Sequence, residues 1–429
     1  MRFVRSRPRR RGPLGPAAPA PAARTLAALA LSAALSVSGP VPAARAAPPP
    51  EPTGAAGAAG AADTTGAAAP TATDRPPARP GDVVSVEPTA FRVLPLGPVE
   101  ARAWRIRYRS TTATGAPNTV SGTVLVPDDD HAGPRPLVGY AVGTVGLADP
   151  CAPSAAFPRG TAVEGPLIQG LLRRGWAVAV TDYEGLGTPG EHTYTVGRSA
   201  GHAVLDAVRA ALRLPEAGLR PDAPVGVMGY SQGGQAAGWA AELHASYAPE
   251  LDLAGTAAGG VPGDLAETAR ANDGGRGSAL VWMSLSGQDA AFPELRLDDD
   301  LNPAGRALLG HLRAHCVALG STVGSSKRLA DLTVRDPLGR PDWQRRLGES
   351  AVGTDRPDRP VYLYHAREDE LIPYDAGRRI RADWCRRGAA VRWRAVEAGG
   401  HVDAALAESP RAADWLSDRF AGVPEPGDC

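Results

Sequence analysis

The hydrophobic positions of this chain fall into short continuous runs that alternate with longer segments of helical periodicity. Four runs are predicted strands, at residues 137–142, 176–181, 225–230 and 253–258. Helical patterns lie between them, at residues 162–174, 200–214 and 232–246. Because strands that alternate with helices pair in parallel and are covered on both faces, the pattern predicts an α/β fold with a mostly parallel sheet.

The same pattern extends in both directions along the chain. Residues 104–110 and 120–126 are strand-like and are separated by a turn composition, which predicts an opening antiparallel hairpin. Two later runs, 361–366 and 391–396, flank a helical pattern, and a closing helix follows them. These two helices are expected at residues 375–387 and 402–420. The sheet is therefore expected to resume late in the chain.

A long gap separates the two parts of the predicted sheet. The usual strand-to-helix connection has about two to six residues, whereas the gap covers residues 261–360. We therefore expect a mainly helical lid or cap inserted between a first core part, 81–260, and a second core part, 361–429. Within the gap, helices are expected at 279–285 and 304–319 and loops at 272–275 and 320–324.

The N-terminal segment has the features of a processed leader. A basic stretch, an apolar run at residues 25–37 and an A-x-A site at Ala44-Arg45-Ala46 predict a signal peptide over residues 1–46. The apolar run is shorter than the roughly 20 residues that span a bilayer as a helix. We therefore expect a secreted protein with no integral membrane segment in its mature form. Residues 47–80, rich in Ala, Pro and Gly, are expected to be a disordered linker.

Charge and cysteine content narrow the possible partners. The chain has 46 basic and 46 acidic residues, so no large field of one sign exists to recruit nucleic acid. The four cysteines all follow the predicted cleavage site, which favours two disulfides in an exported protein over free thiols. Spacing alone leaves all three pairings open; the cysteines are Cys151, Cys316, Cys385 and Cys429.

A candidate nucleophile stands between a predicted strand and a helix of small residues. Gly229-Tyr230-Ser231-Gln232-Gly233 matches the G-x-S-x-G elbow, in which a sharp turn exposes the serine hydroxyl and frees the next N–H for an oxyanion. The pattern alone is common in a chain with 51 glycines, but between this strand and this helix it predicts the α/β-hydrolase fold. A second match surrounds Ser199, but that serine stands where a helix N-cap is expected and has a weak strand before it.

A nucleophilic serine needs an acid and a histidine base, which follow it in this order in the α/β-hydrolase fold. His401 lies after the last predicted strand and before the last helix, where that base belongs. Four other histidines also follow the serine: His244, His311, His315 and His365. The acid is expected in the loop after residues 361–366, where Glu368, Asp369 and Glu370 remain alternatives.

A metal site is a second interpretation of one short segment. His311 and His315 are four residues apart and precede Cys316, a spacing that resembles a metal site. The segment lacks the glutamate of H-E-x-x-H, and its cysteine is expected to be oxidised. We therefore predict no metal.

The motifs together resemble those of the secretory lipase family, the lipase A type of yeasts and bacteria. The matching segments are Cys151-Ala152-Pro153-Ser154, Asp182-Tyr183-Glu184-Gly185, Gly229-Tyr230-Ser231, Ser246-Tyr247-Ala248-Pro249-Glu250-Leu251, Asp369-Glu370-Leu371-Ile372-Pro373-Tyr374 and Gly400-His401. The resemblance implies a Ser231, Asp369 and His401 triad, no cofactor, and hydrolysis of triacylglycerols and simpler esters. It also implies two disulfides, Cys151–Cys316 and Cys385–Cys429.

Two departures from the family concern the oxyanion hole. Gln232 stands where yeast-type members have glycine, and residues 143–146 replace the acidic segment that supplies their second donor. We expect the first donor to be the N–H of Gln232. The second is expected at the backbone of Thr144 or Val145, in the glycine-flanked loop after the third strand.

The main expectation is a triacylglycerol lipase that works at a lipid–water interface, and three alternatives remain. They are a short-chain esterase, a peptidase on the same triad, and a non-catalytic binding protein of the same fold. For a lipase, the insertion should hide an apolar face, for which packing within the insertion is the alternative role. The candidates are Leu280, Trp282, Leu285, Leu308 and Leu309.

Overall fold

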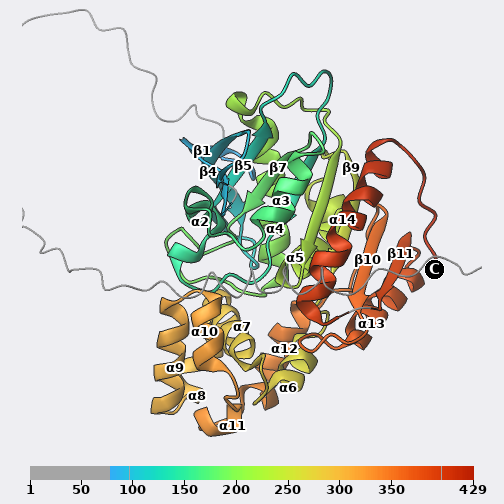
Figure 1. The fold of residues 1–429 in the computed structure, drawn as a ribbon. Coiled ribbons are helices and arrows are strands. Elements are labelled where there is room, and N and C mark those ends of the chain that lie inside the picture. The colour runs from blue at the N-terminus through green and yellow to red at the C-terminus, as the bar shows by residue number, and fades with distance from the viewer. Residues whose placement is uncertain (1–77, 96, 398) are drawn as a thin grey trace, which may run out of the picture. The chain divides into compact units, whose positions relative to one another are not determined.

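The computed structural model describes residues 78–95, 97–397 and 399–429. The predicted signal peptide and nearly all of the predicted linker lie outside these residues. The described chain is built around one large sheet that is covered by helices (Figure 1).

The large sheet has nine strands in the order β1-β4-β5-β7-β6-β8-β9-β10-β11. Strands β6 to β11 are parallel to one another, whereas β1, β4 and β5 are antiparallel, as is the junction of β5 with β7. All eight predicted strands are present, and β1 is an addition. The strands are β1 Val83–Thr89, β4 Ala101–Thr111, β5 Pro117–Pro127, β6 Leu137–Ala141, β7 Ala177–Thr181, β8 Val225–Tyr230, β9 Leu253–Gly259, β10 Val361–Ala366 and β11 Val391–Val396; the separate pair is β2 Arg92–Val93 and β3 Gly97–Pro98.

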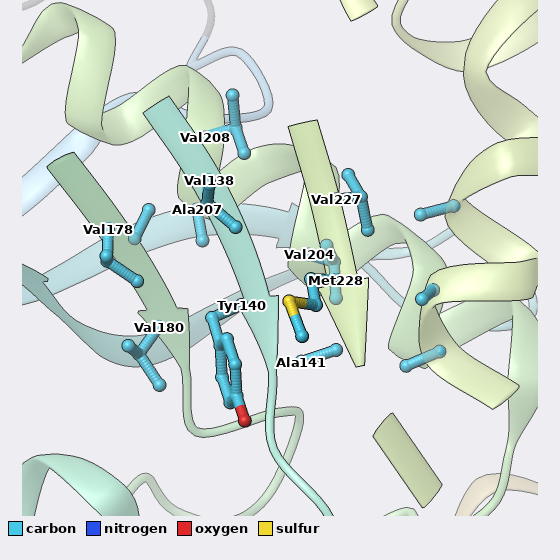
Figure 2. Packing of buried hydrophobic residues seen from close by; sticks show 14 of the residues in the cluster. Val138, Tyr140, Ala141, Val178, Val180, Val204, Ala207, Val208, Val227 and Met228 are labelled. Atoms are coloured by element: carbon cyan, nitrogen blue, oxygen red, sulfur yellow. The ribbon is translucent and has the colours of Figure 1, made fainter. Parts of the chain in front are cut away.

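Helices α4 and α5 cover one face of the parallel strands, and α3 and α14 cover the other. Small residues in the strands allow this close approach: a Cβ at Gly139 would lie 2.7 Å from Val208 of α4, and one at Gly226 would lie 2.9 Å from Phe420 of α14. Figure 2 shows Val204 and Val208 of α4 among the buried side chains of β6 and β8. The core helices are α2 Pro153–Ala156, α3 Gly165–Leu172, α4 Gly197–Arg213, α5 Gln232–Tyr247, α13 Tyr374–Arg386 and α14 His401–Phe420.

The insertion between β9 and β10 is helical and gathers beneath one end of the sheet (Figure 1). Its helices are α6 Leu265–Asn272, α7 Ser278–Ala291, α8 Leu297–Asp300, α9 Pro303–Ala314, α10 Val317–Gly324, α11 Leu329–Leu332 and α12 Pro341–Glu349. The helices expected at 279–285 and 304–319 are therefore present, although the second is divided near Cys316. The loop at 272–275 is also present.

The prediction of a loop at residues 320–324 is wrong, because these residues belong to helix α10. Gly320 lies against Met283, and Gly324 lies against Ala279, both of α7. A Cβ at either glycine would be within 2.8 Å of these side chains. The glycines therefore serve close helix packing here, which offsets their low helix propensity.

The insertion has a hydrophobic core of its own, joined by residues from the loops of the sheet. Of the five side chains expected on a hidden face, four are buried in this core and Leu280 packs against it; the four are Trp282, Leu285, Leu308 and Leu309. These side chains therefore pack within the insertion, which was their alternative role.

Two disulfides join all four cysteines. Cys151 is bonded to Cys316 in the insertion, and Cys385 is bonded to Cys429. This is the pairing that the family resemblance implies. Within residues 78–429, apart from the two gaps, we find no helix with the length and hydropathy needed to cross a membrane.

Candidate active site

Ser231 occupies a sharp turn between the central strand β8 and helix α5. Its φ and ψ angles are 61° and −122°, a conformation that side chains rarely adopt. Its N–H donates to the carbonyl of Gly259 on the neighbouring strand at 2.9 Å. The serine is therefore held at the end of the sheet where the parallel strands finish.

The glycines around Ser231 are required by contacts with backbone. A Cβ at Gly229 would collide with the carbonyl of Gly233, and one at Gly233 would collide with that of Ala141. One at Gly234 would collide with Gly259. Helix α5 can therefore start this close to the strands only with these residues, which explains both the motif and its additional glycine.

Ser199 has a different environment from the one its sequence predicts. Helix α4 begins at Gly197 and its N-cap is Val196, so the expected N-cap role of Ser199 is wrong. The Ser199 hydroxyl is buried and donates to the carboxylate of Glu184. The Ser199 hydroxyl therefore pairs with the half-buried Glu184 and not with the helix end.

Asp369 and His401 are in direct contact. The Nδ1 of His401, the first residue of α14, lies 2.7 Å from Oδ2 of Asp369, in the loop after β10. Oδ1 of Asp369 accepts the N–H groups of Leu371 and Ile372 at 3.0 and 2.8 Å. Burial opposes ionisation of Asp369, but the hydrogen bond and charge of His401 outweigh it and lower the pKa of Asp369. A carboxylate acceptor places the proton on Nδ1, so Nε2 of His401 is the free base nitrogen.

The other two carboxylates of this loop differ from Asp369. Glu370 accepts the backbone N–H of His401 at 2.8 Å, and it lies so close to Gly400 that any side chain there would collide with it. Glu368 is exposed. Glu370 therefore fixes the first turn of α14, a role that its sequence position did not reveal.

Two aromatic side chains surround the Asp369 and His401 pair. His365 of β10 is fully buried, with Nε2 3.0 Å from the carbonyl of Ile372 and 3.4 Å from Oδ2 of Asp369. Burial lowers its pKa, so it is a neutral packed residue, as its position in a strand indicates. The ring of Tyr230 lies 4.9 Å from the ring of His401. Because Tyr230 precedes Ser231, this contact places the histidine beside the elbow.

Gln232 is the first residue of α5, so its N–H has no helical carbonyl to pair with and lies at the positive end of the helix. Its side chain is buried, with Nε2 3.3 Å from Nε2 of His192. Nδ1 of His192 lies 3.0 Å from the carbonyl of Glu184. Burial lowers the pKa of His192 to about 4. This histidine is therefore neutral near pH 7 and can accept the amide of Gln232.

The loop after β6 reaches the same end of the sheet. The N–H of Gly143 donates to Glu164 Oε1 at 2.7 Å, so it is already paired. The hydroxyl of Thr144 lies 2.6 Å from that of Tyr194, and the carbonyl of Val145 accepts an N–H from the insertion. The two backbone donors expected at this loop, Thr144 and Val145, therefore remain the candidates.

Several residues that support this loop were not predicted. Glu164 also accepts the hydroxyl of Tyr140 at 2.7 Å, and burial raises the pKa of Glu164. The hydroxyl of Tyr183 donates to the carbonyl of Val142 at 2.7 Å. Burial raises the pKa of Tyr194 to about 12, so its hydroxyl keeps its proton. Tyr183 lies in a segment that matches the family, which was the one available signal.

The histidines considered for a metal site stack on each other. The rings of His311 and His315 are 4.1 Å apart, and Nδ1 of His315 lies 2.8 Å from the carbonyl of His311. Cys316 is in a disulfide and its sulfur is not a thiolate ligand.

The mostly parallel sheet, the strained serine after β8 and the histidine after the last strand define an α/β hydrolase. The family model described as secretory lipase matches residues 153–427. The chain belongs to the secretory lipase family and is a secreted carboxylic ester hydrolase.

Individual relatives and a solved structure support the family assignment. A secreted triacylglycerol lipase of Malassezia globosa is 30% identical over 80% of this chain and 76% of its own. A probable inactive lipase of Mycobacterium tuberculosis is 31% identical over 81% of this chain and 80% of its own. Candida antarctica lipase A in its closed state has the same fold, with a TM-score of 0.73, 24% identity and coverage of 81% of this chain and 84% of that chain.

Proposed function

We propose that the protein is a triacylglycerol lipase in which Ser231 is the nucleophile, His401 the general base and Asp369 its orienting acid. The observation that carries this proposal is the 2.7 Å contact between His401 and Asp369, in a chain whose serine stands at a strained elbow. A protein that only binds lipid has no need of such a pair.

The reaction runs through an acyl-enzyme. Ser231 Oγ attacks the ester carbonyl carbon while Nε2 of His401 takes the hydroxyl proton. The tetrahedral intermediate collapses, the C–O bond to the alcohol breaks, and His401 returns the proton to the leaving oxygen. Water, deprotonated by His401, then attacks the acyl-enzyme and releases the fatty acid and Ser231. Asp369 stays ionised and stabilises the imidazolium.

The negative charge of the tetrahedral oxygen requires donors at a fixed distance. We assign the first to the N–H of Gln232 and the second to the N–H of Thr144 or Val145. The partial positive charge at the start of α5 adds to the first donor. The hydroxyl of Tyr194 and the carboxyl of Glu164 hold the loop that carries the second.

The substrate class follows from the family and from relatives named as triacylglycerol lipases. Residues 261–360 act as the lid in this proposal, over a site that meets its ester at a lipid–water interface. A short-chain esterase with the same triad is the alternative within enzymes. The relative named as a probable inactive lipase makes a non-catalytic protein the alternative outside enzymes.

The test combines active-site labelling with substrate preference. Purified protein should react with a fluorophosphonate probe, and Ser231→Ala should abolish labelling while Ser199→Ala, the matched control, keeps it. Nitrophenyl esters from acetate to palmitate should be cleaved with a preference for long chains, and the rate should rise when a sparingly soluble ester passes its solubility limit. Absence of labelling in folded protein would support the non-catalytic alternative. A preference for acetate with plain saturation would leave an esterase.

A further inference from the structure

His192 is a buried side chain that the proposed reaction does not use. It is 3% exposed and lies in the segment between β7 and α4. Its Nδ1 is 3.0 Å from the carbonyl of Glu184, and a carbonyl only accepts hydrogen bonds, so Nδ1 carries the ring proton. Burial lowers the pKa of His192 to about 4, so Nε2 is unprotonated near pH 7. The ring therefore offers one acceptor, at Nε2.

That acceptor faces the side chain of the first oxyanion residue. Nε2 of His192 lies 3.3 Å from Nε2 of Gln232, and the amide NH₂ donates to the unprotonated ring nitrogen. Gln232 is buried, and its Oε1 has no hydrogen-bond partner among the residues that the structure describes. Within the described chain, His192 is therefore the one hydrogen-bond partner of the Gln232 amide. The backbone N–H of the same glutamine is the proposed first oxyanion donor.

Two tyrosines beside the His192 ring hold the loop of the proposed second donor. Tyr183 stacks on the ring and Tyr194 meets it edge to face, each with ring centres 6.0 Å apart. The hydroxyl of Tyr183 donates to the carbonyl of Val142 at 2.7 Å, and the hydroxyl of Tyr194 lies 2.6 Å from that of Thr144. Val142 and Thr144 are two residues apart in the loop after β6. One imidazole ring therefore lies between the elements that carry both proposed donors.

We propose that His192 is a positioning residue that sets the distance between the two donors of the oxyanion hole. The inference rests on the proposed function, because these donors act only if Ser231 attacks an ester. Such donors are effective at about 2.7 to 3.1 Å from the oxyanion, which is a narrower range than substrate binding requires. Loss of the imidazole nitrogens should therefore weaken binding of the transition state and leave binding of the substrate nearly unchanged.

The main variant is His192→Phe, which keeps an aromatic ring and removes both nitrogens. His192 lines a cavity of about 280 Å³ together with Ser286 and Arg313 of the insertion. A small residue at this position would open that cavity toward Gln232 and admit water, so phenylalanine is the better substitute. The second variant is His192→Gln, whose amide oxygen can accept the Gln232 amide and so keeps the acceptor without the ring.

The matched control is His202→Phe. His202 is also buried, its Nδ1 lies 3.1 Å from the carbonyl of Thr111, and burial lowers its pKa to about 4. Its ring lies 4.1 Å from the ring of Tyr247, which is the last residue of α5, whereas Gln232 is the first. Both substitutions remove a buried imidazole that bonds a carbonyl, but the contacts of His202 lead to the opposite end of α5.

The assays are hydrolysis of dissolved nitrophenyl butyrate and inhibition by a trifluoromethyl ketone, whose adduct with a serine has a tetrahedral oxyanion. His192→Phe should lower kcat by about 10- to 100-fold, less than the roughly 10² to 10³ of a deleted donor, because both donors remain but are misplaced. Affinity for the ketone should fall by a similar factor, with KM within about twofold of the native value.

The other variants separate positioning from general packing. His192→Gln should lose less kcat than His192→Phe. His202→Phe should keep the native kcat and KM, with a fall in its urea midpoint similar to that of His192→Phe. Gln232→Met keeps the backbone N–H and removes the amide, so it should also lower kcat at constant KM. The double variant with His192→Phe should lose no more than the sum of the two effects less their shared bond, because the amide contact is lost only once.

Three results would overturn the inference while the proposed function stands. They are native kcat in folded His192→Phe, an equal fall in kcat in His202→Phe, and losses that are fully additive in the double variant with Gln232→Met. If His192→Phe does not fold, native kcat in both His192→Gln and Gln232→Met would overturn it as well. A native chain that is folded but shows neither fluorophosphonate labelling nor ester turnover would instead overturn the proposed function, and this inference with it.

Discussion

The disulfide between Cys151 and Cys316 should matter for catalysis as well as for stability, and the second disulfide should matter for stability alone. The change is a pair of double variants, Cys151→Ser with Cys316→Ser, and Cys385→Ser with Cys429→Ser. The comparison is internal, because each double variant serves as the control for the other.

The unfolding free energy that each disulfide contributes follows from the length of the chain segment that it closes into a loop. The sequence separations are 165 and 44 residues. The chain-entropy relation then gives about 5 kcal/mol for the first disulfide and about 4 kcal/mol for the second. The two variants should therefore lose similar amounts of unfolding free energy, within about 1 kcal/mol of each other.

Activity should separate the two variants. Cys316 lies directly against Gly146, whose φ is 115°, and a Cβ at that glycine would be 2.6 Å from the Cys316 backbone. Loss of this anchor frees the loop of the proposed second oxyanion donor, and removal of one such donor costs about 10² to 10³ in kcat. We expect kcat to fall by at least about tenfold, since the donor is loosened and not deleted. Cys385 lies at the end of α13, by the edge where β11 begins, away from the site.

The assay is kcat and KM for a dissolved nitrophenyl ester at a temperature where both variants are folded, with urea unfolding measured in parallel. A fall in kcat without a change in KM is expected only for the first variant. The coupling between the disulfide and the oxyanion loop would be refuted if kcat were the same in the two variants, whether unchanged or lowered in both.

Three other predictions concern single groups. Ser231→Ala should lower kcat by about 10³-fold or more. Ser199→Ala should keep kcat and lose about 1 kcal/mol of stability, because the half-buried carboxylate of Glu184 loses a donor. A fall in activity for the second variant alone would reverse the roles. Tyr194→Phe should lower kcat by roughly tenfold at constant KM, because the oxyanion loop loses its 2.6 Å hydroxyl contact; a change in KM alone would contradict this. His192 and His202 have pKa values lowered to about 4 by burial, so the folded protein binds fewer protons than the unfolded chain. Stability should therefore be full above about pH 6.5 and fall toward pH 4 by up to about 3 kcal/mol for each histidine, and constant urea midpoints over this range would contradict the shifts.

The parts of the fold that the sequence predicted are those determined by local pattern. Strands β6, β7, β8 and β9 are continuous apolar runs, and a buried parallel strand requires such a run whatever its neighbours are. The contact of Gly229 with the carbonyl of Gly233 is likewise local, because the elbow itself brings these two backbones together. The order of serine, acid and histidine follows from the order of the strands.

The parts that the sequence missed depend on contacts between distant segments. Glu164 acts on Gly143, which lies 21 residues earlier, and a glutamate before a helix is an ordinary residue in any pattern. Glu370 was predicted as either the catalytic acid or an exposed charge, since nothing in the sequence shows that it accepts the backbone N–H of His401. Residues 320–324 were predicted as a loop because their glycines suit turns, and only the neighbouring helix α7 reveals that they allow packing.

The same distant contacts limit how the insertion can open. Gln235 of α5 and Gln288 of α7 both donate to the carbonyl of Thr195, at 3.2 and 3.1 Å, and both also donate to Ser350 after α12. At its other side the insertion is bonded to the core through Cys316. A rigid swing of the whole insertion would break this buried network, at about 1 to 3 kcal/mol for each group left unpaired, and would be stopped by the disulfide. In the proposed lipase, opening of the lid would therefore involve shorter segments between these fixed points, and α10 would keep its place beside the loop of residues 143–146.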